Sequence, residues 1–264
     1  MEGAEYQRQL LRDVFGGSSD SEEEEAEEAD GLFSSSHSQS SDTERGLLLS
    51  VPVSNPSRSW QRIETINGLW LCTDFLSPRQ QSSLLSAIQN EGWFTELSHN
   101  QAMRFGDLPF WAVELSDCIH EAICVGDGET DIEDCGNGAC ILPSQLLWRD
   151  PFFDQLIANV YQPGEGICAH VDLMRFEDGI AIVSLESPCV MHFSPVQEDG
   201  EEVPLAVKIP VYLKPGSLLI MWGDARYHWK HEINRKPGFQ VWQGEAIEQK
   251  QRTSITLRKL HISE

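Results

Sequence analysis

The chain has 264 residues, of which 40% are hydrophobic, so it is long enough to bury one large core or two small ones. Its formal net charge is −23, and residues 60–264 alone carry −14 of it. Such an acidic domain repels the phosphate backbone of nucleic acids at long range, so a nucleic-acid substrate would need local positive charge or would bind weakly.

The cysteines and the hydropathy pattern limit where the protein works. Seven cysteines are an odd number and a poor basis for a disulfide framework in a chain of this size. No apolar run reaches the roughly 18 residues that a membrane span needs. We therefore expect a soluble protein of a reducing compartment, the cytoplasm or the nucleus, that has no contact with membranes.

The first 59 residues have the composition of a tail. Residues 20–30 are almost wholly acidic, and residues 34–41 are rich in serine. Segments of this kind bury too little apolar surface to offset the entropy of ordering. We predict a disordered tail over 1–59 and a folded domain over 60–264. The tail is either a solvated spacer or a site for protein partners, with serines that suit an acidophilic kinase.

The first predicted element of the folded part is a helix that begins after Ser77. Gln80 lies three residues later, as in a capping box, and a proline takes the first helical position. Leu84, Leu85 and Ile88 then form one apolar face, and the helix is predicted to end at Gly92.

The rest of the domain reads mainly as strands. Residues 126–138 are predicted to form a loop, and 151–159 a short helical segment. Further on the hydrophobic pattern changes to a period of two, which predicts strands at 180–185, 189–193, 207–213, 217–222 and 253–258. The pattern predicts a mainly β fold, a sandwich or barrel with supporting helices.

His170 and Asp172 are candidate metal ligands. In extended backbone, residues two apart point to the same face, so this imidazole and carboxylate would converge. One more histidine would complete the two-histidine, one-carboxylate triad that leaves open positions on Fe(II). His192, His228 and His231 are the candidates; His192 alternates within a strand and suits a packed histidine, and spacing cannot choose between the other two.

A second pattern indicates a site for a small dicarboxylate. In the predicted strand at 252–258, Arg252, Ser254, Thr256 and Arg258 share one face. Guanidinium groups bind carboxylates through paired hydrogen bonds, and the small polar residues between the two arginines leave space for a ligand. The alternative is a surface strand with solvated arginines.

Three ordered segments carry a resemblance to a known family. They are NVYQPGEGICAHVD at 159–172, RYHWKHEI at 226–233 and RTSITLR at 252–258. Together they resemble the AlkB family of 2-oxoglutarate/Fe(II) dioxygenases, and within it the dioxygenase domain of the tRNA-modifying homologue. The resemblance covers about residues 68–260. It implies a double-stranded β-helix, or jelly-roll, core that uses Fe(II), 2-oxoglutarate and O2.

The resemblance also assigns roles by position. The matched iron ligands are His170, Asp172 and His231. The residues matched to 2-oxoglutarate binding are Asn159, Tyr161, Arg252 and Arg258, with Arg252 on the distal carboxylate. One departure concerns Glu186, which stands where relatives usually have glycine and so bears on the local strand geometry.

A further segment, 100–107, is similar to the family's lid over a flipped-out base. Arg104, Phe105 and Trp111 are therefore candidate substrate contacts, with Phe110 as a further aromatic; the alternative is that these rings pack the sheet. The resemblance implies oxidation of a modified nucleobase, in RNA more than in DNA, with the nucleic acid as a transient partner of a monomer. An oxygenase acting on a protein side chain and a non-catalytic adaptor are the competing hypotheses.

Overall fold

The computed structural model describes residues 59–95, 100–127, 140–197, 207–236 and 238–261. The described residues all belong to one compact unit, Gly46–Glu264. The predicted tail over 1–59 thus lies outside the described residues except for Ser59. No helix among those residues is both long and apolar enough to cross a membrane.

The capping box predicted from the sequence begins the helix α2, Pro78–Asn90. The backbone N–H of Gln80 donates to the Ser77 hydroxyl, and the Gln80 side chain accepts from the Ser77 N–H at 2.9 Å. Gly92 follows the end of the helix with a φ of +69°, a value that glycine adopts without strain. The other helices are α3 (Phe110–Asp127), α4 (Ser144–Leu147) and α5 (Asp224–Tyr227).

Two antiparallel sheets form the centre of the domain. The larger has the order β1-β2-β9-β6-β13-β4-β3, and its strands are Trp60–Arg62, Leu69–Cys72, Ser217–Met221, Ile180–Leu185, Arg252–Arg258, Gln155–Tyr161 and Gln101–Phe105 in that order. The smaller has the order β5-β10-β7-β8, with strands Ile167–His170, Trp229–Ile233, Cys189–Pro195 and Ile209–Leu213. A short hairpin, β11 (Val241–Trp242) and β12 (Glu245–Ala246), stands apart from both.

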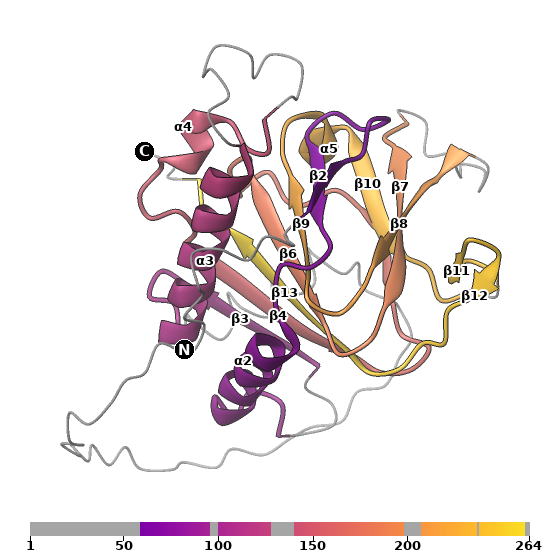
Figure 1. Ribbon diagram of the computed structural model, residues 1–264, viewed down its shortest axis with the longest axis horizontal. Helices are drawn as coiled ribbons and strands as arrows, with labels where there is room; N and C mark the ends of the chain where they lie inside the picture. The colour runs from indigo at the N-terminus through magenta and orange to yellow at the C-terminus, as the bar shows by residue number, and fades with distance from the viewer. Residues whose placement is uncertain (1–58, 96–99, 128–139, 198–206, 237, 262–264) are drawn as a thin grey trace, which may run out of the picture. The chain divides into compact units, whose positions relative to one another are not determined.

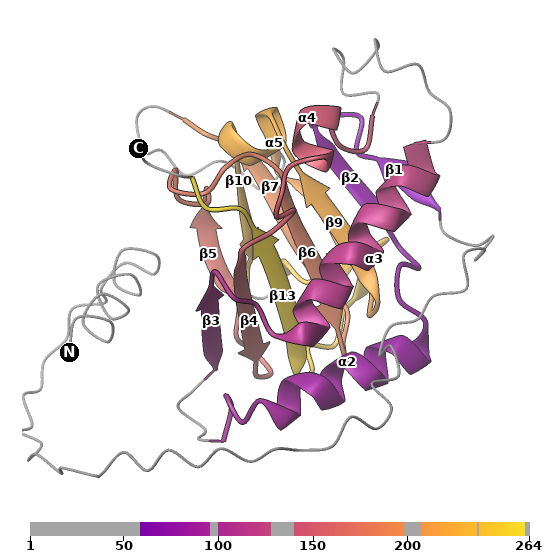
Figure 2. The same ribbon diagram turned by 90° about the vertical axis from the view of Figure 1, so that its left-hand side faces the viewer.

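The elements are arranged in three layers. Helices α2 and α3 cover one face of the seven-stranded sheet, and the four-stranded sheet lies on its other side (Figures 1 and 2). One hydrophobic cluster joins the helices to the large sheet, and a second lies between the two sheets. This confirms the predicted mainly β architecture with helical support, of the jelly-roll type.

Alternation along the central strand β13 makes the space between the sheets polar on one side. Ile255 and Leu257 point to the helices, where they join the first cluster. Ser254 and Thr256 therefore point between the sheets, together with the two arginines at the ends of the strand. On the side of the large sheet, the apolar cluster between the sheets consists of residues of β2, β6 and β9 and includes none of β13. The space next to β13 is therefore lined by polar side chains of that strand.

The predicted helical segment at 151–159 is wrong. Asp150 and Pro151 are joined by a cis peptide bond, and the chain then enters β4, which pairs with β13 on one side and β3 on the other. As an interior strand, β4 is apolar on both faces over Leu156–Ala158, so it lacks the alternation that marks a half-buried strand. The predicted loop at 126–138 is wrong at its start, because α3 continues to Asp127; residues 128–139 lie outside the described residues.

Candidate functional site

Three potential metal ligands meet between the sheets. His170 ends β5, His231 lies opposite it in β10, and Asp172 follows two residues after His170. One ligand atom from each lies within 4.8 Å of the others. The Nε2 atom of His231 is 3.7 Å from Oδ2 of Asp172, and the two imidazole centroids are 4.3 Å apart. Two nitrogens and one carboxylate oxygen are the donors of the facial triad that suits Fe(II).

A β-bulge sets the direction of His170. The pairing of β5 with β10 steps three residues on β5, from Ile167 to His170, against two on β10, from Ile233 to His231. The extra residue lets both Ile167 and His170 face the space between the sheets. The carbonyl of Cys168 in the bulge accepts a hydrogen bond from Nδ1 of His170 at 2.8 Å, which leaves Nε2 as the nitrogen available to a metal.

The carboxylate of Asp172 is buried and ionised. Burial raises its pKa, but the charge of Arg258, with smaller contributions from His231 and His170, outweighs burial and lowers the pKa to about 2. Arg258 forms an ion pair with Oδ1 of Asp172, and its guanidinium also lies 4.7 Å from the Phe176 ring. The charged form of Asp172 is the form that binds a metal.

His231 is neutral for related reasons. Burial and the neighbouring His170 lower its pKa to about 3, against the opposing effect of Asp172. The structure places the candidate histidines differently. His231 is buried beside Asp172, whereas the His228 side chain is 73% exposed and pairs with Asp224. His192 is buried, and its register partner in β10 is Glu232, whose side chain points away from the space that His231 faces.

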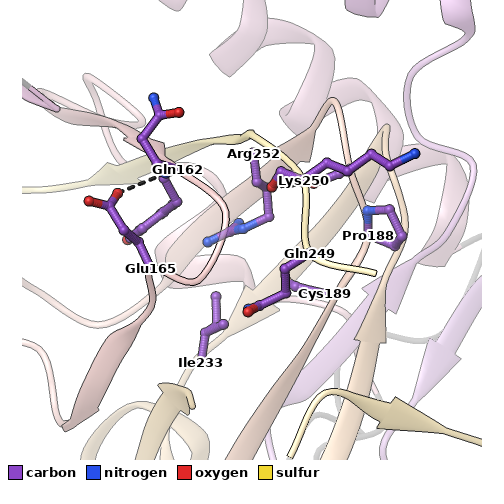
Figure 3. A pocket seen from close by; sticks show the side chains of 10 residues that line it. Gln162, Glu165, Pro188, Cys189, Ile233, Gln249, Lys250 and Arg252 are labelled. Atoms are coloured by element: carbon purple, nitrogen blue, oxygen red, sulfur yellow. Dashed lines mark hydrogen bonds between the residues drawn. The ribbon is translucent and has the colours of Figure 1, made fainter. Parts of the chain in front are cut away.

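A pocket lies at the Arg252 end of β13. Ile233 lies two residues beyond His231 and lines this pocket together with Tyr161, Cys189 and Arg252. The Arg252 side chain, 4% exposed as a residue, points into the space between Glu165, Gln249 and Ile233 (Figure 3). Its guanidinium donates to Ser184 at 3.4 Å and lies 4.5 Å from the Tyr161 ring centroid. A buried guanidinium at the end of a pocket is a receptor for a carboxylate.

The two arginines of β13 do different things. Arg258 pairs with Asp172 and donates to Gln155, so its guanidinium is bound to a candidate metal ligand. Arg252, at the opposite end of the strand, is the one that reaches the pocket. The prediction that Arg252 and Arg258 bind the two ends of one dicarboxylate therefore does not fit the structure.

Asn159 and Tyr161 share the face of β4 that looks toward the triad. Asn159 pairs in register with Ser254, and Tyr161 with Arg252. The Asn159 side-chain oxygen accepts from Gln101 of β3 at 2.6 Å, which fixes the amide. The pKa of Tyr161 is raised, mainly by burial, so its hydroxyl stays protonated and able to donate.

The three candidate substrate contacts fall on two faces of the large sheet. Segment 101–105 is the strand β3, paired along its whole length with β4. Phe105 lies in register with Gln155 and so shares the face of the large sheet that looks toward the triad. Arg104 points the other way, 4.3 Å from the Trp93 ring, and Trp111 is 4% exposed in the helix-side core. Trp111 thus packs the sheet, and neither it nor Arg104 reaches the triad.

One residue that the sequence did not suggest is Arg226, in α5. Its guanidinium donates to the carbonyls of Asp172 at 2.8 Å and Leu173 at 2.7 Å. The sequence offers only a weak indication of this role, because an arginine at the start of the motif at 226–233 is more often solvated than buried. Gln155, which accepts from Arg258, was missed because it lies in the segment predicted to be helical.

The comparisons with known proteins agree with this donor set. A family model described as the 2OG-Fe(II) oxygenase superfamily matches residues 133–258. This match and the His-Asp-His donor set support a dioxygenase that uses Fe(II), 2-oxoglutarate and O2. The chain is similar in sequence to two curated AlkB homologues and similar in fold to one solved structure.

The first relative is the Xenopus tropicalis protein named tRNA (carboxymethyluridine(34)-5-O)-methyltransferase alkbh8. It is 30% identical over 215 residues, or 74% of this chain and 32% of that protein. The Arabidopsis thaliana alkylated DNA repair protein ALKBH8 homolog is 27% identical over 220 residues, or 74% of this chain and 59% of that protein. The chain thus spans less than two thirds of either relative.

The solved structure is that of OsALKBH1. It has a TM-score of 0.52 and 16% sequence identity, and the alignment covers 76% of this chain and all of that chain. At this identity the match speaks for the fold, which is the jelly roll described above.

Proposed function

We propose that His170, Asp172 and His231 hold the Fe(II) ion, that Arg252 receives the distal carboxylate of 2-oxoglutarate, and that the substrate is a modified nucleobase, in RNA more than in DNA. The observation that carries the substrate part is Phe105, an aromatic residue of the edge strand β3 on the face of the large sheet that looks toward the triad. An aromatic ring stacks on any base, which suits a base taken out of its strand.

The residues present fit an iron ion. Asp172 is ionised, His231 is neutral, and His170 has Nε2 available, so all three are in their ligating forms. Arg258 occupies Oδ1 of Asp172 and leaves Oδ2 toward His231, which favours a single carboxylate bond to the metal. When bound, Fe(II) with 2-oxoglutarate and O2 supplies the oxidant that converts a C–H bond to C–OH, with release of succinate and CO2.

The pocket fits 2-oxoglutarate by its placement. Ile233 on its wall lies two residues beyond His231 in β10, and the buried Arg252 lines it as well, which supports a diacid held between the triad and this guanidinium. Tyr161 offers a protonated hydroxyl on the same wall. Arg252 would pair with the far carboxylate, and the near end of the diacid would face the triad.

The nucleobase assignment draws on two further points. The frog relative's name gives tRNA as a substrate of that protein, and the Arabidopsis relative's name gives DNA repair. If the oxidised carbon is a methyl on nitrogen, the hydroxymethyl product releases formaldehyde and leaves N–H on the base. The acidic charge of the chain favours weak, transient contacts with the phosphate backbone.

Release of succinate tests the proposal. Metal-loaded full-length protein is given 2-oxoglutarate with methylated RNA, methylated DNA or methylated peptides, each beside its unmethylated copy. We expect stimulation by methylated RNA, less by DNA and none by peptides, with formaldehyde matching the extra succinate. His170→Ala, which removes a proposed ligand, is the inactive control. Stimulation by a peptide alone would favour the protein side-chain oxygenase instead.

A further inference from the structure

Arg226 is among the most deeply buried charged side chains in the domain. It is 1% exposed and heads the largest fully buried side chains. Within the described part of the chain, its hydrogen-bond acceptors are all main-chain carbonyls, those of Asp172 at 2.8 Å, Leu173 at 2.7 Å and Phe176 at 3.3 Å. The guanidinium also lies 4.8 Å from the ring of Tyr227.

Burying a cation without a carboxylate partner is costly, and packing alone would be served better by an apolar side chain. The hydrogen bonds of Arg226 have a geometric consequence, because they hold the main chain at the carbonyls of Asp172 and Leu173. Arg258 meanwhile holds Oδ1 of Asp172.

The position of Arg226 in the chain links two of the proposed ligands. It lies in α5, in the connection that leads into β10 and His231. Its guanidinium reaches back to the segment 172–176, which follows β5 and carries Asp172. Arg226 thus links the segment that carries Asp172, through its hydrogen bonds, to the segment that carries His231, through the main chain.

The geometry points to Arg226 as a positioning residue for the metal-binding carboxylate, an inference that rests on the proposed iron site. Arg226 fixes the Asp172 backbone, Arg258 fixes one carboxylate oxygen, and the remaining oxygen is directed at His231. Groups that orient a metal ligand in this way typically change metal affinity by about 10- to 100-fold when they are removed.

Arg149 provides a matched control. It is a half-buried arginine that donates to main-chain carbonyls of the segment after 172–176, those of Asp178 at 2.5 Å and Gly179 at 3.0 Å. It also donates to the carbonyl of Phe152. Arg149 therefore binds the segment that follows 172–176, and none of these hydrogen bonds involves Asp172. Loss of Arg149 should reduce stability as loss of Arg226 does, but should not move the carboxylate.

The test measures metal binding and stability side by side in the full chain. Co(II), an oxygen-stable probe for the Fe(II) site, is titrated in the presence of 2-oxoglutarate into wild type, Arg226→Ala, Arg226→Lys, Arg149→Ala and Arg149→Lys. Calorimetry gives Kd, the visible d–d absorption of Co(II) reports the ligand geometry, and thermal melts without metal give Tm.

We expect Arg226→Ala to raise the Kd for Co(II) by at least about tenfold and to change the d–d band. Arg226→Lys keeps the charge but cannot donate to several carbonyls at once, so it should fall between alanine and wild type. Both Arg149 variants should lower Tm while keeping Kd within about threefold of wild type.

Equal Kd values for wild type and Arg226→Lys, with Arg226→Ala unfolded or also unchanged, would overturn the inference and leave Arg226 a purely structural residue. An equal rise in Kd for the Arg149 variants would overturn it as well. If wild type itself bound no Co(II), the proposed metal site would fail first, and that result is distinguishable because it needs no variant.

Discussion

Arg258 and Asp172 form a buried ion pair in which the guanidinium contacts Oδ1 of the carboxylate. The other oxygen, Oδ2, lies 3.7 Å from Nε2 of His231. Because Arg258 holds Oδ1, the geometry favours a single carboxylate bond to a metal, through Oδ2. A metal bound by this oxygen and two imidazoles keeps open coordination positions, which an oxygenase needs for its co-substrates.

The two histidines of the β10 region give the first prediction. His231→Ala should abolish both Fe(II) binding and 2-oxoglutarate turnover without substrate, because it removes a buried ligand beside Asp172. His228→Ala should leave most of both, since its exposed ring pairs only with Asp224. Iron content and succinate release are the measurements. The opposite pattern would show that His228 is the ligand.

The second prediction concerns the grip on 2-oxoglutarate. Arg252→Lys keeps the charge but loses the planar fork, so KM for 2-oxoglutarate should rise at least tenfold, about 1.4 kcal/mol. Arg252→Ala should raise it further. Lys250, also on the pocket wall but 67% exposed, is the control, and Lys250→Ala should change KM little. An unchanged KM in both Arg252 variants would place the diacid elsewhere.

Glu186 gives a prediction about stability. Its φ of +70° is in the left-handed region, where glycine is unstrained. The carboxylate accepts hydrogen bonds from Thr253 and Gln251, which offset the strain. Glu186→Ala loses the bonds and keeps the strain, so it should cost about 1–3 kcal/mol of unfolding free energy.

Glu186→Gly loses the same bonds but relieves the backbone, so it should be about 1 kcal/mol more stable than Glu186→Ala. Urea unfolding of the metal-free protein compares the two variants. If alanine proved as stable as glycine, the backbone at this turn would not be strained.

Much of the domain followed from local patterns, and the errors have physical causes. The capping box at Ser77 and the alternation in β13 were correct because each depends on neighbouring residues alone. Residues 151–159 were predicted to be helical because the interior strand β4, which begins at Gln155, is apolar on both faces and loses its alternation. The neighbours of β4 in the sheet are β13 and β3, which are distant in the sequence, so local patterns could not show that it is an interior strand.

The site was predictable in part for the same reason. The motif and the family resemblance brought together His170, Asp172 and His231, and geometry agrees with that choice. Arg258 was assigned to the co-substrate because it shares one face of the strand with Arg252. A shared face does not show whether a long side chain binds a co-substrate or a protein carboxylate, and Arg258 pairs with Asp172. Trp111 was a candidate for stacking, whereas its place in the sequence also suits the core in which it lies.

His192 gives a prediction of pH dependence. Burial lowers its pKa from the ordinary value, and Lys208 adds to this effect while Glu232 opposes it. The unfolded chain therefore binds a proton more readily than the folded one. The stability that His192 contributes is complete above its unfolded pKa of about 6.5 and is lost as pH falls below it. In chelator-treated protein, His192→Gln should reduce the loss of unfolding free energy between pH 8 and pH 5.5, measured with urea. An identical pH slope for wild type and variant would contradict the prediction.

The last prediction concerns the substrate. Phe105→Ala should lower turnover on methylated RNA, since stacking on a base contributes roughly 1–3 kcal/mol, while 2-oxoglutarate decay without substrate stays unchanged. Phe105→Tyr keeps the ring and should keep most of the activity. Trp148→Ala is the matched control, because Trp148 is 68% exposed but contacts His120 of α3, on the helix side of the large sheet.

Binding to RNA should also respond weakly to salt. The chain is strongly acidic and neutralises few phosphates, so the log–log slope of affinity against salt should be about −2 to −4. Filter binding of methylated RNA between 50 and about 200 mM salt measures it. A protein side-chain oxygenase would show no RNA binding, and Phe105→Ala would then affect stability alone. If methylated peptide stimulates succinate release and neither RNA nor DNA does, the nucleobase assignment is wrong, although the iron and 2-oxoglutarate assignments stand.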